Sequence, residues 1–340
     1  MKKLLASIII TLVSIISASA QGIICVQGDT TAPIFVTDLS DAISKAKAGD
    51  HIYLPGGSTF TNNVTINKKL FIIGAGYDPS STKAAGATYI TGDWLLDTGA
   101  RESYISGIDG KGIIIYIKAS NVTVTRCLLG GIGLQDNPSN ISISENIIQS
   151  NRIGYSLHGN NISNPILVFN NVLLGQIALF RNGVFVNNVF SQSNGNYLIN
   201  QCQYVRFENN IFFHSNPSLT LVGVGNNHFR NNLFLIDSTT VVGGASSMSS
   251  NIFKQSSDSI FKTYDWQLIW NQNYNFHLQQ NCKGIKAGTD STDVGIYGSS
   301  NPFKSGGIPI NPHFQEIHIP TGTTPDGKLN VKIKVQGQGR

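Results

Sequence analysis

Charged residues are scarce in this sequence. They make up 13% of its 340 residues, against about 25% in an average soluble domain. This low charge density excludes a coiled coil, an acidic disordered chain and a nucleic-acid-binding arm of clustered Lys and Arg. Only four cysteines occur, at wide and irregular spacings: Cys25, Cys127, Cys202 and Cys282. They do not match the usual zinc motifs, so we expect no metal, no cofactor and no nucleic-acid partner, and we expect these cysteines to be core residues or to form one disulfide.

Apolar runs long enough to cross a membrane are also missing, since a span takes about 20 residues. The N-terminal run, residues 4–16, follows Lys2 and Lys3 and precedes Ala-Ser-Ala at 18–20. This is the layout of a secretory signal peptide, with an uncleaved anchor as the alternative. We expect cleavage after Ala20, a secreted, periplasmic or cell-surface protein, and no integral membrane segment afterwards. Without Lys2 and Lys3 the net charge falls from +5 to +3, which is too weak to indicate polyanion binding.

What the sequence does contain is a repeat in which one Asn, here called the slot, precedes two apolar residues. The slots are Asn146, Asn171, Asn188, Asn210, Asn232 and Asn251, with Cys127 in the equivalent place one step earlier. The steps are 19, 25, 17, 22, 22 and 19 residues long. Short alternating apolar segments lie before and after the slots, separated by Asn, Gly and Ser. Three short strands per period of about 20 residues indicate a stacked β-solenoid.

The slot has a physical reason in such a stack. Asn tolerates the left-handed conformation that a sharp turn requires, and its amide both donates and accepts hydrogen bonds. When coils stack at about 4.8 Å, slot asparagines can pair into an internal ladder. We therefore predict an all-β, single-stranded, right-handed parallel β-helix with three-strand coils.

The two apolar residues after each slot present a problem of alternation, because successive strand residues point to opposite faces. We predict that the second residue points into the core. The first residue then forms an outward apolar stripe that the C-terminal segment or a partner chain covers; the alternative is that the turn buries both. The stripe consists of Leu128, Ile147, Val172, Val189, Ile211, Leu233 and Ile252.

The two ends of the stack differ from its middle. An amphipathic helix over residues 38–48 would cap the N-terminal end and hide the open sheet edge. The segments "GDHIYLPGGSTF" and "NVTINKKLFIIGAG" then follow up to Gly76, and "YNFHLQQNCKGIKAGTDSTDVGIYG" covers residues 274–298. These segments resemble right-handed parallel β-helix proteins of the pectin-lyase-like superfamily, the last one resembling the coil-closing segment of exported bacterial members. We expect a signal peptide at 1–20, the β-helix domain at 21–298, and an extended C-terminal arm at 299–340.

The resemblance implies a fold but no particular activity, since the superfamily includes lyases, hydrolases, esterases and adhesins. A glycosidase needs two carboxyl groups about 5–9.5 Å apart, and acids are few in the repeat region. The Arg-x-Pro-x-x-Arg and Asp-His motifs of pectate-lyase-like members are also missing. Arg126, Arg152, Arg181, Arg206 and Arg230 do not share one position relative to the slots, so we expect surface arginines. We expect turn or surface roles for His158 and His214.

Two functions remain. The first is a non-catalytic platform that binds polysaccharide or glycan or presents a surface, because neutral amides and aromatic rings suit sugar hydroxyls and ring faces. The second is a polysaccharide lyase or glycoside hydrolase with a diverged site, using Arg152, His158 or Arg181. The sequence favours the platform and leaves the oligomeric state open. The candidate binding residues are Arg152, Tyr155, His158, Arg181 and Tyr197, and Tyr204 is a further reachable ring.

Overall fold

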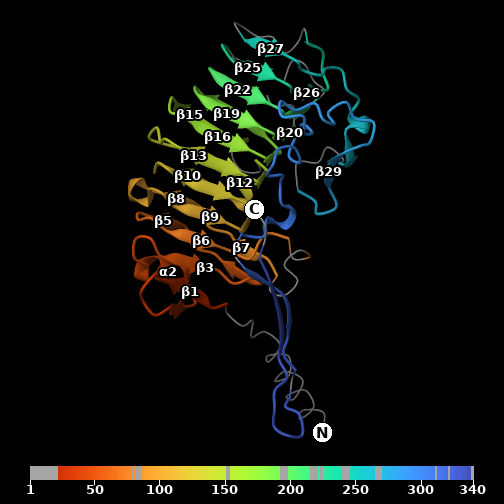
Figure 1. Cartoon of the computed structure of the whole chain (residues 1–340). Helices are drawn as coiled ribbons and strands as arrows, with labels where there is room; N and C mark the ends of the chain where they lie inside the picture. Colours follow the sequence, from red (N-terminus) through yellow and green to blue (C-terminus); the bar gives the residue numbers. More distant parts are fainter. Residues whose placement is uncertain are drawn as a thin grey trace, which may run out of the picture.

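Short strands separated by turns stack coil upon coil (Figure 1), and they form three faces, each built mainly of parallel strands. The computed structural model describes residues 22–78, 80, 86–150, 154–191, 198–214, 221–222, 225–238, 246–264, 270–310, 312–320 and 322–337. Equivalent strands of successive coils pair in parallel register. The fold is therefore the predicted all-β parallel β-helix. The expected signal peptide, residues 1–20, lies outside the described residues.

The first face is a 12-stranded sheet. It is parallel apart from β1, which pairs antiparallel with β2 and β3 at the N-terminal end. In spatial order its strands are β2 (Ile34–Val36), β1 (Ile24–Gln27), β3 (His51–Tyr53), β6 (Phe71–Ile73), β9 (Tyr104–Ser106), β11 (Thr123–Thr125), β13 (Ile141–Ser144), β16 (Ile166–Phe169), β19 (Gly183–Val186), β22 (Val205–Glu208), β25 (His228–Arg230) and β27 (Ser247–Ser249).

The second and third faces belong to one 15-stranded sheet, because β10 (Asp109–Ile117) and β12 (Leu128–Leu134) run along both of them. The remaining strands of the second face are β4 (Ser58–Phe60), β7 (Thr88–Ile90), β14 (Ile147–Ile148), β17 (Val172–Leu173), β20 (Val189–Ser191), β23 (Ile211–Phe213) and β26 (Leu233–Phe234). Those of the third face are β5 (Val64–Ile66), β8 (Trp94–Leu96), β15 (Tyr155–Ile162), β18 (Gln176–Phe180), β21 (Ile199–Asn200) and β24 (Leu221–Val222).

Residues two places after the slot fill the interior, as predicted. The rings of Phe190, Phe212 and Phe234 stack nearly parallel, with centroids 4.8 and 4.5 Å apart. All three are fully buried. Each buried aromatic side chain contributes a large apolar area, so the stacked rings hold successive coils together.

The slot asparagines form the internal ladder. From Asn146 to Asn232, each Nδ2 donates to Oδ1 of the next slot asparagine at 3.0–3.1 Å, and Asn251 is the last acceptor. Each Oδ1 also accepts the backbone N–H of the preceding slot residue, and that of Cys127 donates to Asn146 at 2.9 Å. The ladder therefore pairs buried backbone groups at a corner that the strands cannot pair.

The prediction that the slot itself is left-handed is wrong. The residue immediately before the slot takes this conformation in every coil, at φ between 53° and 56°. These preceding residues are Arg126, Glu145, Asn170, Asn187, Asn209, Asn231 and Ser250. The sharp turn thus points one side chain outward and the next, the slot asparagine, inward.

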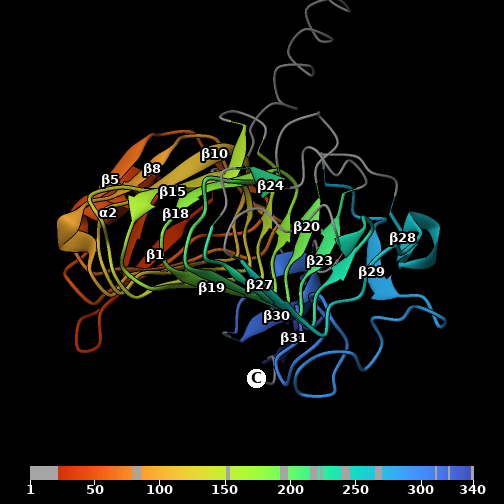
Figure 2. The ribbon, with the colours of Figure 1, turned by 90° about the horizontal axis from the view of Figure 1, so that it is seen from above.

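The outward stripe is covered by the chain itself, as the covering hypothesis expects, but mostly by residues that precede the expected C-terminal arm at 299–340. Residues 257–264 and 270–308, here called the cover segment, return along the second face and bury the stripe in a core separate from the interior of the coils. Ile260, Phe261, Phe276, Val294 and Ile296 are each at most 5% exposed there. Figure 2 shows β28 (Phe261–Thr263) and β29 (Asn275–Leu278) on the outer side of β20 and β23.

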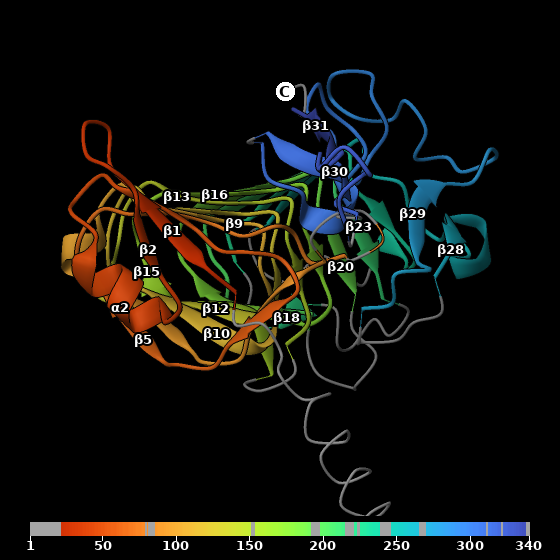
Figure 3. The same cartoon turned by 90° about the horizontal axis from the view of Figure 1, so that it is seen from below.

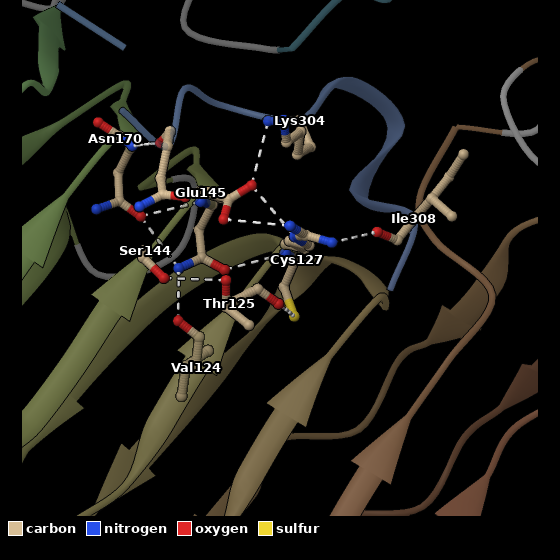
Figure 4. A network of polar contacts seen from close by, with 12 residues as sticks. Val124, Thr125, Cys127, Ser144, Glu145, Asn170, Lys304 and Ile308 are labelled. Carbon is tan, nitrogen blue, oxygen red and sulfur yellow. Dashed lines mark hydrogen bonds and ion pairs between the residues drawn. The ribbon is translucent and has the colours of Figure 1, made fainter. Parts of the chain in front are cut away.

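The left-handed residues hold the cover segment in place (Figure 4). Asn187 Nδ2 donates to the Gly295 carbonyl at 3.1 Å, and Asn209 exchanges two bonds with Thr289. Nearer the N-terminal end, the Lys304 N–H donates to Glu145, and Arg126 Nη1 donates to the Ile308 carbonyl at 3.0 Å. The cover segment therefore runs from the later coils back towards the earlier ones, and hydrogen bonds attach it to successive coils.

The expected surface position of Arg126 is wrong, since its side chain is buried. His214 is buried as well, so the surface alternative of the turn or surface role expected for it is wrong. Arg126 is buried because it forms an ion pair with Glu145 at 3.1 Å beneath the cover segment. All four cysteines are free, so the alternative of one disulfide is also wrong; Cys127, Cys202 and Cys282 are buried.

The two ends of the chain complete the fold. Helix α2 (Leu39–Lys45) begins at Asp38, whose side chain accepts the Asp41 N–H, and closes the N-terminal end of the stack (Figure 3). Its residues Leu39, Ala42 and Ile43 are buried. At the other terminus, β30 (His313–His318) and β31 (Lys332–Gln336) form an antiparallel hairpin. Three one-turn helices lie in the described loops: η1 (Thr98–Ala100), η2 (Ser257–Ser259) and η3 (Ser305–Gly307).

No helix in the described part of the chain is both long and apolar enough to cross a membrane.

Candidate functional site

A hollow of about 320 Å³ lies on the outside of the third face, where β10, β12 and β15 run side by side. It is formed by aromatic rings, amides and a glycine. Its lining residues are Tyr116, Gly133, Leu134, Gln135, Tyr155, His158 and Asn160.

Strand register explains why the rings of the hollow face outward. Tyr116, Gly133 and His158 pair in adjacent strands and form one column across the face. Their neighbours Ile115 and Leu157 are fully buried, so alternation directs this column to solvent. Tyr116 and His158 are two coils apart, or about 9.6 Å at the usual strand spacing, and Gly133 between them has no side chain.

The hollow is shaped by its glycine and by a bulge. A Cβ on Gly133 would lie 3.1 Å from the Tyr116 ring, so the ring leans over the glycine. In β15 the register shifts between His158 and Ile162, and Asn160 is left-handed at φ 49°. Such a bulge redirects side chains from the regular alternation, which is how Asn160 reaches the edge of the hollow.

The rings of Tyr155 and His158 are in edge-to-face contact, with centroids 4.9 Å apart at 63°. This arrangement is a favourable one for aromatic pairs, and it orients both side chains. The hollow therefore offers two rings on one side, the Tyr116 ring on the other, and the amides of Gln135 and Asn160.

Partial burial lowers the pKa of His158 below its usual 6.5, because desolvation disfavours the imidazolium. At neutral pH none of the described residues that line the hollow therefore carries a charge. The nearest described charges along the chain belong to Lys118 and Asp136, which pair at 3.3 Å. The described lining of the hollow is thus uncharged.

A pH dependence follows from the lowered pKa of His158. The unfolded chain binds this proton more readily than the folded one, so the His158 contribution to stability is constant above about pH 6.5 and falls as pH drops towards the folded pKa. We expect the imidazole resonances of His158 to titrate with a midpoint below 6.5. His158→Gln identifies these resonances, and a midpoint above 6.5 would contradict the burial argument.

The structure brings two of the predicted binding residues into the hollow, Tyr155 and His158. Arg181 lies outside its lining; it is exposed and its Nε donates to Asn161 Oδ1 at 3.4 Å. Arg152 and Tyr197 lie outside the described residues. The binding roles of these residues stay predictions.

Sequence reasoning missed Tyr116, Gly133 and Gln135. All three precede the first slot asparagine, Asn146; no slot precedes Tyr116, and the coil of Gly133 and Gln135 is marked only by Cys127 in the slot position. Their signal was the spacing of Tyr116 and Gly133 within apolar segments, and it becomes meaningful only when the parallel pairing is known.

The described lining of the hollow holds aromatic, amide and small or apolar residues. Two carboxyl groups must flank the scissile bond, and none of the described residues lining the hollow has a carboxyl group. Within the described ranges no group of three His, Cys, Asp or Glu side chains is arranged to hold a metal ion. What the arrangement can do is stack rings and exchange hydrogen bonds.

A second hollow, of about 430 Å³, lies at the capped end beside α2 and includes Asp38 and Asn62. The Asp38 carboxylate accepts the Asp41 N–H at 2.9 Å and Asn62 Nδ2 at 2.8 Å. Because this carboxylate already caps the helix and holds the neighbouring loop, the third-face hollow is the better candidate site.

Comparison of the chain with protein-family models, with curated proteins and with solved structures finds no match.

Proposed function

We propose that this protein is an exported, non-catalytic carbohydrate-binding β-helix whose ligand lies in the third-face hollow. The observation that carries the proposal is the grouping of Tyr116, Tyr155 and His158 around the hollow, with amides beside them. Aromatic rings stack on the apolar faces of sugars while their polar edges remain hydrated, and Gln and Asn side chains both donate and accept hydrogen bonds.

Export and a place in the pectin-lyase-like superfamily are parts of the same proposal. Export is supported by the basic, apolar and small-residue order of residues 2–20. The superfamily is supported by the parallel coils and by the helix and strands at the N-terminal end, at α2, β3 and β5. A glycan-binding role outside the cell is consistent with both.

The proposal is tested by calorimetric titration with a panel of oligosaccharides. We expect Tyr116→Ala and His158→Ala each to weaken the binding of a bound glycan by about tenfold, which corresponds to about 1.4 kcal/mol. Tyr204→Ala is the matched control, because Tyr204 is 59% exposed and precedes β22, several coils away. Equal losses in all three variants, or binding that survives Tyr116→Ala unchanged, would place the ligand elsewhere.

The catalytic alternative is checked with the same panel. A lyase produces unsaturated products that absorb in the ultraviolet, and a hydrolase produces new reducing ends. We expect binding without either product. Turnover that disappears in His158→Ala would replace the binding proposal with a diverged enzyme.

A further inference from the structure

Resting on the proposed function, we propose that the ligand is an uncharged glycan, one sugar ring of which stacks on the Tyr116 ring where that ring leans over Gly133, and that uronate-containing glycans do not bind there. Gly133 is then the position that determines how the ligand fits the hollow.

Charge excludes an acidic sugar from the hollow. A carboxylate that leaves water needs an opposite charge and hydrogen bonds to offset its desolvation. Among the described lining residues none supplies a cation at neutral pH, and the neighbouring Lys118 already pairs with Asp136. Arg181, the exposed cation near the bulge, donates to Asn161 and does not line the hollow.

Register sets where a sugar ring can lie. Tyr116 and His158 stand two coils apart, about 9.6 Å between their backbones by the strand spacing, and the Tyr116 ring leans over Gly133, which lies between them. A sugar ring therefore stacks on the outer face of the Tyr116 ring at a contact distance of about 3.5–4.0 Å, and the amides of Gln135 and Asn160 lie within the same hollow.

Local packing makes the hollow sensitive to any side chain added at Gly133. An added Cβ would lie 3.1 and 3.3 Å from two atoms of the Tyr116 ring, so Gly133→Ala shifts this ring without meeting backbone. Gly112 lies in β10 of the same sheet, and a Cβ added there meets nothing within 4 Å. The two alanine variants therefore separate an effect on the hollow from a general effect of replacing a strand glycine.

The experiment is calorimetric titration of the full chain at pH 7.5 with cellohexaose, mannohexaose, xylohexaose and trigalacturonate. We expect at least one uncharged oligosaccharide to bind, Gly133→Ala to weaken it at least fivefold, Gly112→Ala to leave it within twofold, and trigalacturonate not to bind. Circular dichroism melting shows whether both glycine variants remain folded.

The outcomes separate the inference from the proposed function. Trigalacturonate binding that is lost in Tyr116→Ala would overturn the uncharged-glycan inference while keeping a glycan site in the hollow. Unchanged affinity in a folded Gly133→Ala protein would overturn the placement over Gly133. Failure of every oligosaccharide to bind would overturn the proposed function together with the inference.

Discussion

Replacing Asn188 with alanine is expected to lower the free energy of unfolding by about 3–5 kcal/mol. Asn188 is fully buried, and its Nδ2 donates to the carbonyls of Val168 and Val186 and to Asn210. Its Oδ1 accepts the backbone N–H and Nδ2 of Asn171, both at 3.0 Å. Alanine leaves several of these groups buried without a partner, and each such group costs about 1–3 kcal/mol.

Urea unfolding at equilibrium measures this loss. Asn182→Ala is the matched control, because the Asn182 side chain is only half-buried and donates one bond, to the Ser163 carbonyl at 3.2 Å. It is expected to cost less than about 1 kcal/mol. Similar losses in the two variants would show that the ladder does not stabilise the stack.

Replacing Glu145 with alanine is expected to destabilise the protein by about 3–5 kcal/mol, because Arg126 then remains as a buried charge without its carboxylate. The ion pair is nearly inaccessible, at 4% and 13% side-chain exposure. Glu145 also accepts the Lys304 N–H, and Arg126 donates to Ile308 (Figure 4). The variant therefore weakens both the coil stack and the attachment of the cover segment.

Urea unfolding and limited proteolysis test this expectation together. We expect faster cleavage between residues 299 and 310 in Glu145→Ala, and a smaller loss of stability when Arg126→Met accompanies Glu145→Met, because no buried charge is left. Asp136→Ala breaks the exposed pair with Lys118 and is expected to cost at most about 1 kcal/mol. A Glu145→Ala protein as stable and as protease-resistant as Asp136→Ala would contradict the pinning role.

The coil stack was predictable because its interior repeats two chemically distinct columns. A buried amide and a large apolar residue recur at the same offset, so that Asn188 and Phe190 mark one coil and Asn210 and Phe212 the next. The left-handed outer column was not predicted, because its members differ in type. Its signal was the Asn doublet at 187–188 and 209–210, whose first residue faces outward and whose second forms the ladder.

The sequence showed that the apolar stripe needs a cover, but not which residues provide it. The stripe that includes Val189 and Ile211 had to be buried, yet nothing in its own sequence identifies what buries it. The partners are Val294, Ile296 and other apolar residues of the cover segment, which are brought there by hydrogen bonds from side chains as different as Asn187 and Arg126. Such long-range pairing depends on the direction of the returning chain, which local patterns do not encode.

The candidate site was half predictable. Tyr155 and His158 follow a slot in the sequence and could be named as reachable aromatic residues. Strict alternation would place them on opposite faces, and a register shift between Tyr155 and Leu157 brings both outward. Tyr116 and Gly133 join them only through parallel pairing across coils of unequal length, and the bulge after His158 changes the register again. Because Gly133 has no side chain, its part in the hollow can be recognised only when the residues of the neighbouring strands are known.

The central functional claim is that an uncharged glycan binds over Gly133 on the third face. Its most direct test is amide chemical-shift mapping of the ¹⁵N-labelled protein during titration with the uncharged hexaose that binds. The predicted result is that shifts cluster at Tyr116, at residues 133–135 and at residues 155–160. Shifts that avoid these residues and cluster on the first face or along the cover segment would contradict the claim.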